Sequence, residues 1–569
     1  MKRILLALII IAFLFQNSSF GNNNDITGGW CGTKAPSDNW ENAFQREVAN
    51  YMLNHYSGRN SNVPISIPII VHVVYYSNTA AQNISKAQID SQIVVLNRDY
   101  SGTSYYYNNI PAAFKPLVSN TNITWCPAKV GMNGTLLPEY GIDRVDGRAL
   151  GFPNPNLTGG WSKAYIDETV KPLTIWNPDY YCNVWIVPRM QGGIIGYATF
   201  PTNTTLDGLG GGNATSTTDG VVIAAFAYGK GGSTVAPYNQ GGTAAHELGH
   251  WLGLRHISGD AACGNDYCDD TPPQSGGNSG GQNGLNYGCA TFPFHANGCS
   301  GTTGPNGEMY MNYMDYSDDN CTSMFTNDQK TRMQTTMTFG DRRQTLLSST
   351  MCDTVIPAPV ADFISTLQNA ALCVSSRSFN FTDKSIFGAT TWSWSFSGGT
   401  PTTSNVKNPT GIVFTTAGLH TVTLTVTSPR GTSTISKEIN VPIIGSATLP
   451  LQEDFEGNDF PPVGWNFVNR NGNMNINWES ISGFSAWGIG SKCMRFDNTS
   501  LDARGFDDDI VTPKLNFTGI STSNLKFDVA YAPYYDGSTS IFDTLEVYIT
   551  DNCESTVQRI YTKGGTVLA

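Results

Sequence analysis

Apolar and polar positions divide the chain into a first half with long apolar runs and helical periods and a second half of short alternating segments. Residues 67–76, almost all Ile, Val and Tyr, predict a buried strand. Helical spacing of apolar positions predicts helices over 39–56 and 81–100. Other apolar runs that predict strands cover residues 123–130, 180–188 and 220–226. The first half should therefore form an α/β domain.

Residues 193–201 mix small and large side chains and predict a strand at the edge of that sheet. An edge strand has unpaired backbone groups, which can hold an extended peptide. This segment is therefore a candidate for substrate binding.

Short alternating segments separated by turn signals continue from residue 355 to residue 441 and predict a β-sandwich. Residues 450–569 contain further strand-like segments, and the last of them has no evident closing strand. We expect a second β domain there, in a sequence that is truncated.

The N-terminus predicts secretion. Met1-Lys2-Arg3 is basic, residues 4–15 are apolar, and residues 16–21 are small or polar, as in a signal peptide over 1–21. The apolar run is too short for a comfortable membrane span and no second one follows, so no stable span is expected. Export would allow the 12 cysteines to be oxidised.

The size and charge of the chain further limit the number of domains and the classes of binding partner. A chain of 569 residues should hold about three or four domains. Its 33 Lys and Arg against 45 Asp and Glu give a net charge of −12, which disfavours nucleic acid and anionic membranes as partners. Charged residues make up only 14%, which is typical of secreted β-rich proteins.

Three of the seven histidines lie within eleven residues and predict a zinc site. On a helix, His246 and His250 project from one face, while Glu247 is turned by about 100° and can act as a base. Gly253 can end the helix in a left-handed turn that brings in His256 as third ligand. A buried structural helix is the alternative, but the extended spacing favours zinc, with the fourth position open for water.

Residues 22–59 cannot form a core alone, and they contain the isolated Cys31. Its thiolate could occupy the fourth zinc position until this pro-segment is removed, because thiolates bind zinc strongly. An ordinary disulfide is the alternative. The bond between Arg59 and Asn60 is a candidate activation site.

Beyond His256 the chain is rich in Cys, Gly, Asn and Asp, so disulfides are expected to replace a hydrophobic core. Hard oxygen ligands for calcium could come from this region, with a solvated acidic loop as an equal alternative. The candidate ligands are Asp266, Asp269, Asp270 and Thr271. Further on, Met314 lies between aromatic residues in a predicted tight turn and could pack beneath the metal site.

Two motifs together, HExxHxxGxxH and the methionine turn, resemble the metzincin clan of zinc peptidases and, in detail, its pappalysin family. The matching details are residues 67–75, residues 196–201 and Asn312-Tyr313-Met314-Asp315-Tyr316 followed by Cys321. The resemblance covers residues 60–353. It implies a zinc site of three histidines, with Glu247 as general base and acid, Met314 below the metal, and Tyr316 as a donor to the oxyanion.

The same resemblance implies regulation and further sites. Cys31-Gly32-Thr33 is similar to the inhibitory cysteine of bacterial proenzymes, and related enzymes carry structural calcium and disulfides. The implied disulfides are Cys263 with Cys299 and Cys289 with Cys321, although Cys268 departs from the pattern. A preference for a basic residue after the scissile bond would be read by Asp318 or Asp319.

Residues 354–444 resemble a PKD-type immunoglobulin-like module, with its paired tryptophans in the core, and residues 450–569 resemble a MAM-like or cleaved-adhesin jelly roll. Such modules imply spacing or contact with matrix or polysaccharide. The predicted fold is therefore multidomain: an α/β (α+β) metzincin catalytic domain followed by two all-β sandwich domains.

The sequence thus predicts a secreted, latent zinc endopeptidase that acts on extracellular proteins or peptides. An adhesin or matrix-binding protein, in which the C-terminal domains carry the main role, is the alternative from another class. Another zinc hydrolase, such as an amidase, is a third.

Overall fold

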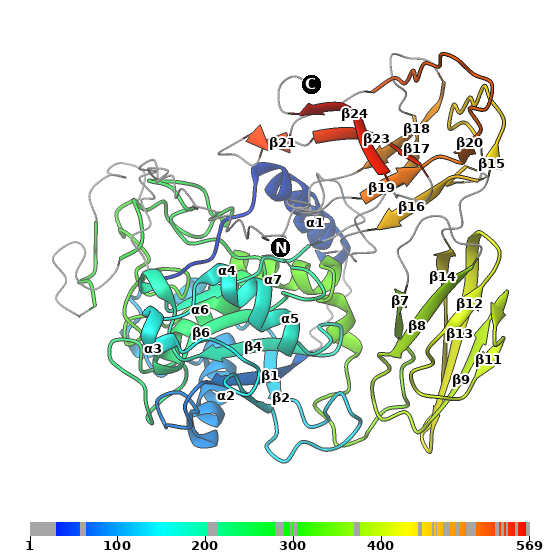
Figure 1. The fold of residues 1–569 in the computed structure, drawn as a ribbon. Coiled ribbons are helices and arrows are strands. Elements are labelled where there is room, and N and C mark those ends of the chain that lie inside the picture. Colours follow the sequence, from blue (N-terminus) through cyan, green and yellow to red (C-terminus); the bar gives the residue numbers. More distant parts are fainter. Residues whose placement is uncertain are drawn as a thin grey trace, which may run out of the picture.

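The computed structural model describes residues 30–56, 64–202, 214–278, 289–295, 299, 304–368 and 376–441, and shorter stretches between 446 and 564 (Figure 1). The predicted signal peptide over 1–21 and the candidate cut at Arg59 lie outside the described residues. In the part of the chain that is described, no helix has the length and apolarity needed to cross a membrane.

Strand β1 (Ile65–Tyr75) organises the first sheet and confirms the strand predicted over 67–76. Its residues 67–74 are buried without interruption, as expected for a central parallel strand. On one side β1 pairs with β4 (Cys182–Val187), which pairs with β6 (Val221–Ala224). On the other side it pairs first with β2 (Ile123–Pro127) and then with β3 (Ile142–Asp146). All these pairings are parallel.

Strand β5 (Gly196–Ala198) lies at the edge of this sheet, as predicted for residues 193–201. It is the antiparallel partner of β6, and the path across the sheet runs β2-β1-β4-β6-β5. The second edge of β5 is therefore open to another chain segment.

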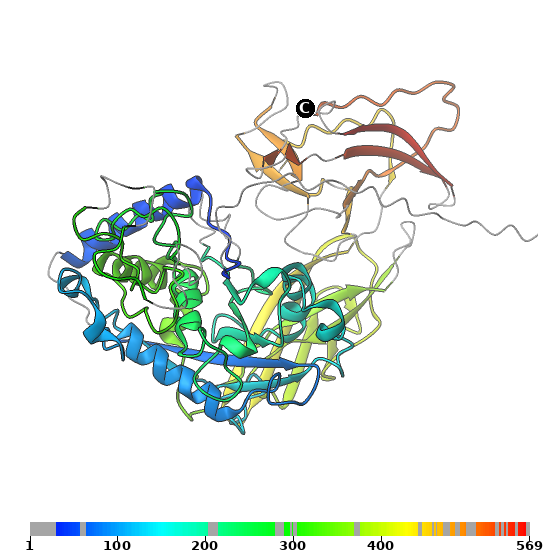
Figure 2. The same cartoon turned by 90° about the vertical axis from the view of Figure 1, so that its left-hand side faces the viewer.

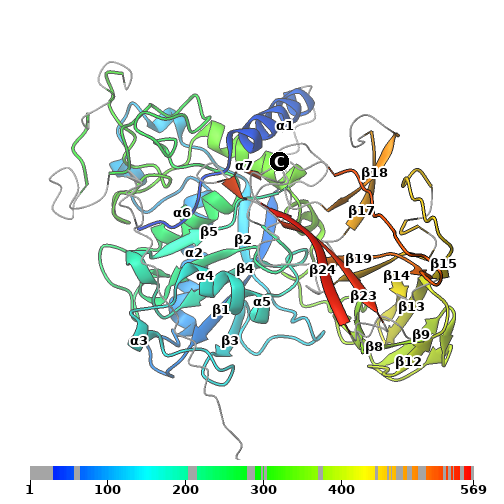
Figure 3. The ribbon, with the colours of Figure 1, turned by 45° about the horizontal axis from the view of Figure 1, so that its top comes forward.

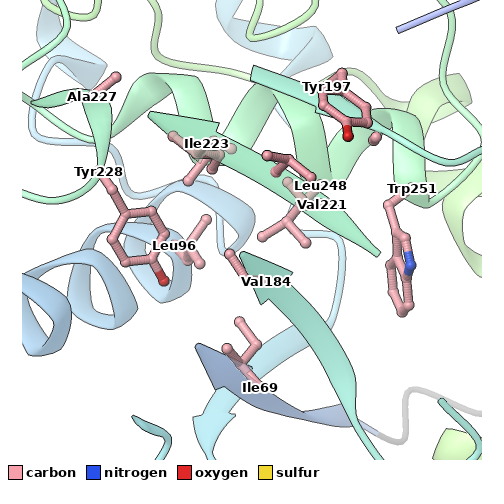
Figure 4. Packing of buried hydrophobic residues seen from close by; sticks show 14 of the residues in the cluster. Ile69, Leu96, Val184, Tyr197, Val221, Ile223, Ala227, Tyr228, Leu248 and Trp251 are labelled. Carbon is pink, nitrogen blue, oxygen red and sulfur yellow. The ribbon is translucent and has the colours of Figure 1, made fainter. Parts of the chain in front are cut away.

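Two long helices pack on the sheet. Helix α2 (Lys86–Tyr100) begins later than the predicted residue 81, because the Ser85 side chain caps it by accepting from Gln88 N. Helix α6 (Gly242–Trp251) carries the histidine motif. Figure 4 shows Leu96 of α2 and Leu248 of α6 in one apolar cluster with Val184 of β4 and Val221 of β6. Shorter helices between β3 and β4 are α3 (Pro155–Thr158), α4 (Lys163–Tyr165) and α5 (Lys171–Thr174).

The N-terminal helix α1 (Asp38–Tyr56), predicted over 39–56, packs against α7 (Asn327–Phe339), as seen in Figure 3. The apolar pattern does not predict α7, because its sequence is mostly polar. Its start carries a capping box in which Thr326 and Gln329 bond each other's backbone amides.

A β-sandwich of two four-stranded sheets follows, as predicted. One sheet has the order β10-β12-β8-β7 and the other β11-β9-β13-β14. Trp394 is buried between them, whereas Trp392, predicted to share this core, is only partly buried beside Lys407. The strands are β7 (Phe363–Leu367), β8 (Arg377–Asp383), β9 (Thr391–Phe396), β10 (Gly399–Thr400), β11 (Thr403–Ser404), β12 (Ile412–Phe414), β13 (Gly418–Ser428) and β14 (Gly431–Val441).

Beyond residue 445 the described stretches form two-stranded pairs (Figure 2). They make the C-terminal region β-rich, and the jelly roll stays a prediction. The pairs are β15 (Ser446–Ala447) with β20 (Lys514–Leu515), β16 (Asn466–Asn469) with β19 (Asp508–Val511), β17 (Trp478–Ser482) with β18 (Lys492–Phe496), β21 (Tyr534–Tyr535) with β22 (Ser540–Ile541), and β23 (Thr544–Asp551) with β24 (Thr556–Gly564).

Both disulfides implied by the family resemblance are present, one joining Cys263 to Cys299 and the other Cys289 to Cys321. Cys268, the departure from the pattern, is buried and free. A third disulfide was not predicted. It joins Cys126 of β2 to Cys352, 226 residues later, and so ties the end of the α/β region back to its sheet.

A buried ion pair holds α6 to the segment after α7. The Asp219 carboxylate accepts from Arg343 Nη1 at 2.5 Å and from Trp251 Nε1 at 2.9 Å. The Arg343 guanidinium lies 3.7 Å from the centroid of the Trp251 ring. Removing the acid would leave this arginine buried without its counter-charge.

We therefore expect Asp219→Ala to destabilise the α/β domain by about 3–5 kcal/mol, the usual cost of breaking a buried ion pair. Denaturant unfolding of the full chain, followed through a probe in the α/β domain, measures this. Asp90→Ala is the matched control, because Asp90 pairs with Lys86 on the surface and should contribute about 1 kcal/mol or less. Equal effects of the two changes would contradict the role of Asp219.

Candidate metal centre

Helix α6 places two histidines one turn apart. Its start is held by Asp319, whose Oδ2 accepts from the backbone amides of Gln240 at 2.8 Å and Gly241 at 2.9 Å. The helix ends before Gly253, which has φ +87°, the left-handed turn expected from its position. The chain then returns to bring His256 beside His246 and His250.

The Nε2 atoms of the three histidines converge. His250 Nε2 lies 3.1 Å from His246 Nε2 and 3.1 Å from His256 Nε2. All three side chains are buried. With the Cys31 thiol, their ligand atoms lie within 4.8 Å of one another, and this is the one such cluster of His, Cys, Asp and Glu among the described residues.

Each histidine uses its other nitrogen for a hydrogen bond to an oxygen. His246 Nδ1 lies 2.7 Å from Tyr313 O, and His250 Nδ1 lies 2.7 Å from Leu254 O. His256 Nδ1 bonds the Asp260 carboxylate. Since carbonyl and carboxylate oxygens only accept, each Nδ1 carries the proton and each Nε2 presents a lone pair.

Burial lowers the pKa of His246 and His250 well below the usual value, and the neighbouring His256 lowers both further. The two imidazoles are therefore neutral, the form that binds a metal ion. Burial opposes ionisation of Asp260, but its contacts with His256 outweigh this and lower its pKa to about 2. Asp260 was not predicted; its spacing of four residues after the third histidine was the available signal.

Glu247 lies between the histidines and the edge strand. Its Oε2 accepts from Thr33 Oγ1 at 2.9 Å and from Cys31 Sγ at 3.6 Å, while its buried Oε1 has no partner among the described residues. Burial raises the pKa of Glu247 to about 8, against the opposing effect of the bonds from Thr33 and Cys31. A carboxyl group with such a pKa can take and return a proton near neutrality.

The segment from Trp30 to Thr33 lies along the open edge of β5. Cys31 forms a parallel bridge with Gly196, supported by bonds of 2.8 Å from Gly32 N to Gly196 O and from Ile195 N to Trp30 O. This pairing brings Cys31 Sγ to 3.5 Å from His250 Nε2. Cys31 is buried and is not in a disulfide, so the disulfide alternative does not hold.

Met314 lies against the helix that carries the histidines, and the Tyr316 ring lies against the histidine rings. Met314 is fully buried against α6, where a Cβ on Gly249 would lie 2.5 Å from its sulfur. The Tyr316 ring lies 4.8 Å from the His256 ring, centroid to centroid. Its hydroxyl is buried and has no hydrogen-bond partner among the described residues. This group is therefore available as a donor beside the histidines.

The two candidate specificity acids differ in their surroundings. The Asp319 carboxylate is occupied by the amides at the start of α6, and burial raises its pKa to about 6. Asp318 is buried next to it, and burial alone raises its pKa. Among the described residues, backbone amides bond the carboxylate of Asp319 and not that of Asp318, so Asp318 is the better placed of the two to pair with a basic side chain.

The calcium candidates do not converge on one point. The Asp266 carboxylate accepts from Thr271 Oγ1 at 2.9 Å, and burial raises its pKa to about 7. Asp270 instead accepts from the amide of Asp328 at the start of α7, and Asp269 is exposed.

The donor set fits a metal ion. The Nε2 atoms of the three histidines face one point, and Cys31 Sγ lies beside them at 3.5 Å from His250 Nε2. The buried, unpartnered Oε1 of Glu247 and the Tyr316 hydroxyl lie beside them. Tetrahedral sites of this composition are typical of catalytic zinc.

Comparison with known proteins also indicates a metalloprotease. A family model described as pregnancy-associated plasma protein-A matches residues 165–338, and a model of the PKD domain matches residues 356–443. An extracellular metalloprotease of Colletotrichum graminicola is 29% identical over 307 residues, 53% of this chain and 88% of that protein. Extracellular metalloprotease 1 of Coccidioides posadasii is 29% identical over 272 residues, 48% of this chain and 76% of that protein.

Two solved structures from Tannerella forsythia are also similar in sequence. Mature mirolysin in complex with a cleaved peptide is 36% identical, over 50% of this chain and 96% of that chain, with a TM-score of 0.41. A promirolysin mutant is 34% identical, over 56% of this chain and 96% of that chain, with a TM-score of 0.43.

Proposed function

Because this chain belongs to the pappalysin family and is an extracellular metalloendopeptidase, we propose that zinc is its metal and that His246, His250 and His256 hold it. The observation that carries the proposal is the convergence of three Nε2 atoms, each left unprotonated by a bond at Nδ1. Neutral imidazoles in a three-nitrogen site with an open position favour zinc. Bound there, zinc would supply Lewis-acid chemistry to water and to the peptide carbonyl.

Glu247 is the general base and acid of the proposed reaction. Its unpartnered Oε1 can accept the proton of the attacking water and then give it to the leaving amine of the peptide. The raised pKa of about 8 suits both transfers. Tyr316 can donate its free hydroxyl to the oxygen on which negative charge develops.

The edge of β5 is the proposed substrate-binding strand. Gly196 and its neighbour Ile195 already bond the backbone of residues 30–32, so this edge can hold an extended segment within reach of Glu247. A peptide substrate would use the same backbone groups. Sequence-independent binding of this kind suits an endopeptidase.

Latency through Cys31 is proposed on the same geometry. The segment that pairs with β5 occupies the substrate's place, and Cys31 Sγ is directed at the histidine cluster. Thr33 holds Glu247 at the same time. Both the metal site and the base are thus blocked by one strand, and we propose residues 22–59 as the removable pro-segment.

A preference for a basic residue after the scissile bond is proposed for Asp318, because Asp319 is occupied at the start of α6. Structural calcium at the acidic loop is a further proposal, in which the buried Asp266 carboxylate would supply a hard oxygen ligand. The proposed limits of the catalytic domain are residues 60–353, followed by the PKD domain over 354–444. Matrix or polysaccharide contact is proposed for the PKD domain and for residues 450–569.

Removing the metal should abolish proteolysis. We expect a zinc chelator to stop casein cleavage by the activated protein completely, and stoichiometric zinc to restore it, because the proposed reaction depends on a metal held by the three imidazoles. Gel analysis of casein with and without chelator measures this. An adhesin would give no cleavage under any activation, and chelator-resistant cleavage would exclude the metal mechanism.

A further inference from the structure

Glu41, on the inner face of α1, is fully buried and is held by two arginines. Arg332 Nη1 donates to Glu41 Oε1 at 2.6 Å, and Arg332 Nη2 donates to Glu41 Oε2 at 3.2 Å. Arg255 Nη1 lies 3.5 Å from Glu41 Oε2. The carboxylate therefore makes a two-pronged contact with one guanidinium and an ion pair with the other, the geometry that gives carboxylate recognition its specificity.

The two arginines are positioned by the catalytic region itself. Arg332 Nη2 also donates to Gly253 O at 3.0 Å, and Arg255 Nε donates to Asp260 Oδ2 at 3.2 Å. Both guanidinium groups thus also bond residues outside α1, Arg332 at the turn after α6 and Arg255 at the segment after His256. Arg332 is 1% exposed, so without a carboxylate its charge would lack its main counter-ion in a shielded place.

Apolar contacts surround this ion pair. The Trp40 ring stacks on Phe44 with centroids 4.9 Å apart and meets Phe200 edge-on at 5.6 Å. Trp40 Nε1 donates to Pro201 O at 3.0 Å, and the Arg332 guanidinium lies 4.8 Å from the Phe44 ring centroid. The turns of α1 that carry Trp40 and Phe44 are therefore docked at a place distinct from the β5 edge that holds Cys31.

We propose that Arg255 and Arg332 form a carboxylate-binding site, separate from the metal, that recognises Glu41 and keeps residues 30–56 bound after the chain is cut. The segment is then a two-point inhibitor that can rebind in trans, and its release, rather than the cut, is the activating step. This inference rests on the proposed latency through Cys31.

Synthetic peptides of residues 30–56, added to activated full-length protein freed of its own segment, test this proposal. Binding is read by fluorescence anisotropy and inhibition by casein cleavage. The peptide variants are the native sequence, Glu41→Gln, Cys31→Ser and Asp38→Asn. Asp38→Asn is the matched control, because it removes the same charge from an exposed position in the first turn of α1.

We expect Glu41→Gln to weaken binding at least about tenfold, because a neutral amide removes the carboxylate that pairs with the buried Arg332 and one of the two that pair with Arg255. Asp38→Asn should change binding by no more than about threefold, the size of a helix-terminus effect. Cys31→Ser should lose most inhibition while still binding through Glu41.

The outcomes separate the two proposals. Equal binding of the native and Glu41→Gln peptides, or complete loss of binding by Cys31→Ser, would overturn the carboxylate site and leave the latency proposal intact. If the Cys31→Ser peptide inhibits as strongly as the native one, the latency proposal fails, while anisotropy still measures the contribution of Glu41.

Discussion

Replacing Glu247 by alanine should abolish peptide hydrolysis and leave the metal bound. The three histidine contacts do not involve this carboxylate, whose free Oε1 is the proposed proton carrier. Loss of a general base costs about 10²–10⁴-fold in rate. The measurement is the casein cleavage rate of the activated variant, together with its zinc content by atomic absorption.

Glu168→Ala is the matched control for this variant, because Glu168 is an exposed glutamate of the same domain and should leave the rate unchanged. Glu247→Gln, which keeps the shape of the side chain and removes its basicity, should be as inactive as Glu247→Ala. Full activity in either Glu247 variant would refute the proposed mechanism. Loss of zinc from them would instead assign Glu247 to the metal site.

Replacing Cys31 by alanine should turn the latent precursor into an enzyme that is active, or degrades itself, without a cut. Cys31 Sγ is directed at His250, and thiolate is among the strongest zinc ligands in proteins. We expect the activity of the uncut precursor to rise on the order of a hundredfold, because a tethered thiolate acts at high effective concentration. Casein cleavage by freshly purified precursor measures this.

Two further variants test whether the effect is specific to Cys31 and whether the activity belongs to this chain. Cys493→Ala removes another free cysteine, outside the catalytic region, and should stay latent. The double change of Cys31 and Glu247 to alanine should be stable and inactive, which would show that the activity belongs to this chain. A stable and inactive Cys31→Ala precursor would mean that the thiol is not what keeps the enzyme silent.

The metal site was predictable because most of it is local. His246 and His250 follow from the helical period, and His256 follows from the turn at Gly253. The partners of their Nδ1 atoms were not, since Tyr313 O comes from a turn 67 residues away and becomes a partner only when that turn packs against α6. Asp260 is local, four residues after His256, but that spacing alone does not assign an acidic residue to a histidine nitrogen.

The predicted strands β1, β4 and β6 share a strong cue, a run of apolar residues that is buried in the sheet. Helix α7 lacks that cue, because it is mostly polar and its packing depends on partners such as Glu41. The disulfide between Cys126 and Cys352 could not be paired from spacing, because only the folded sheet brings the two ends together. A pattern within one stretch of sequence does not predict long-range contacts of this kind.

The contacts of the N-terminal segment also set an order of events during synthesis. Cys31 lies 219 residues before His250, and Glu41 lies 291 residues before Arg332. Since a chain is made and exported from its N-terminus, residues 30–56 are present before His246 has been translated. On the proposed latency, the metal site would therefore be completed only after its tethered inhibitor, and the cell that makes this enzyme would need no separate inhibitor protein.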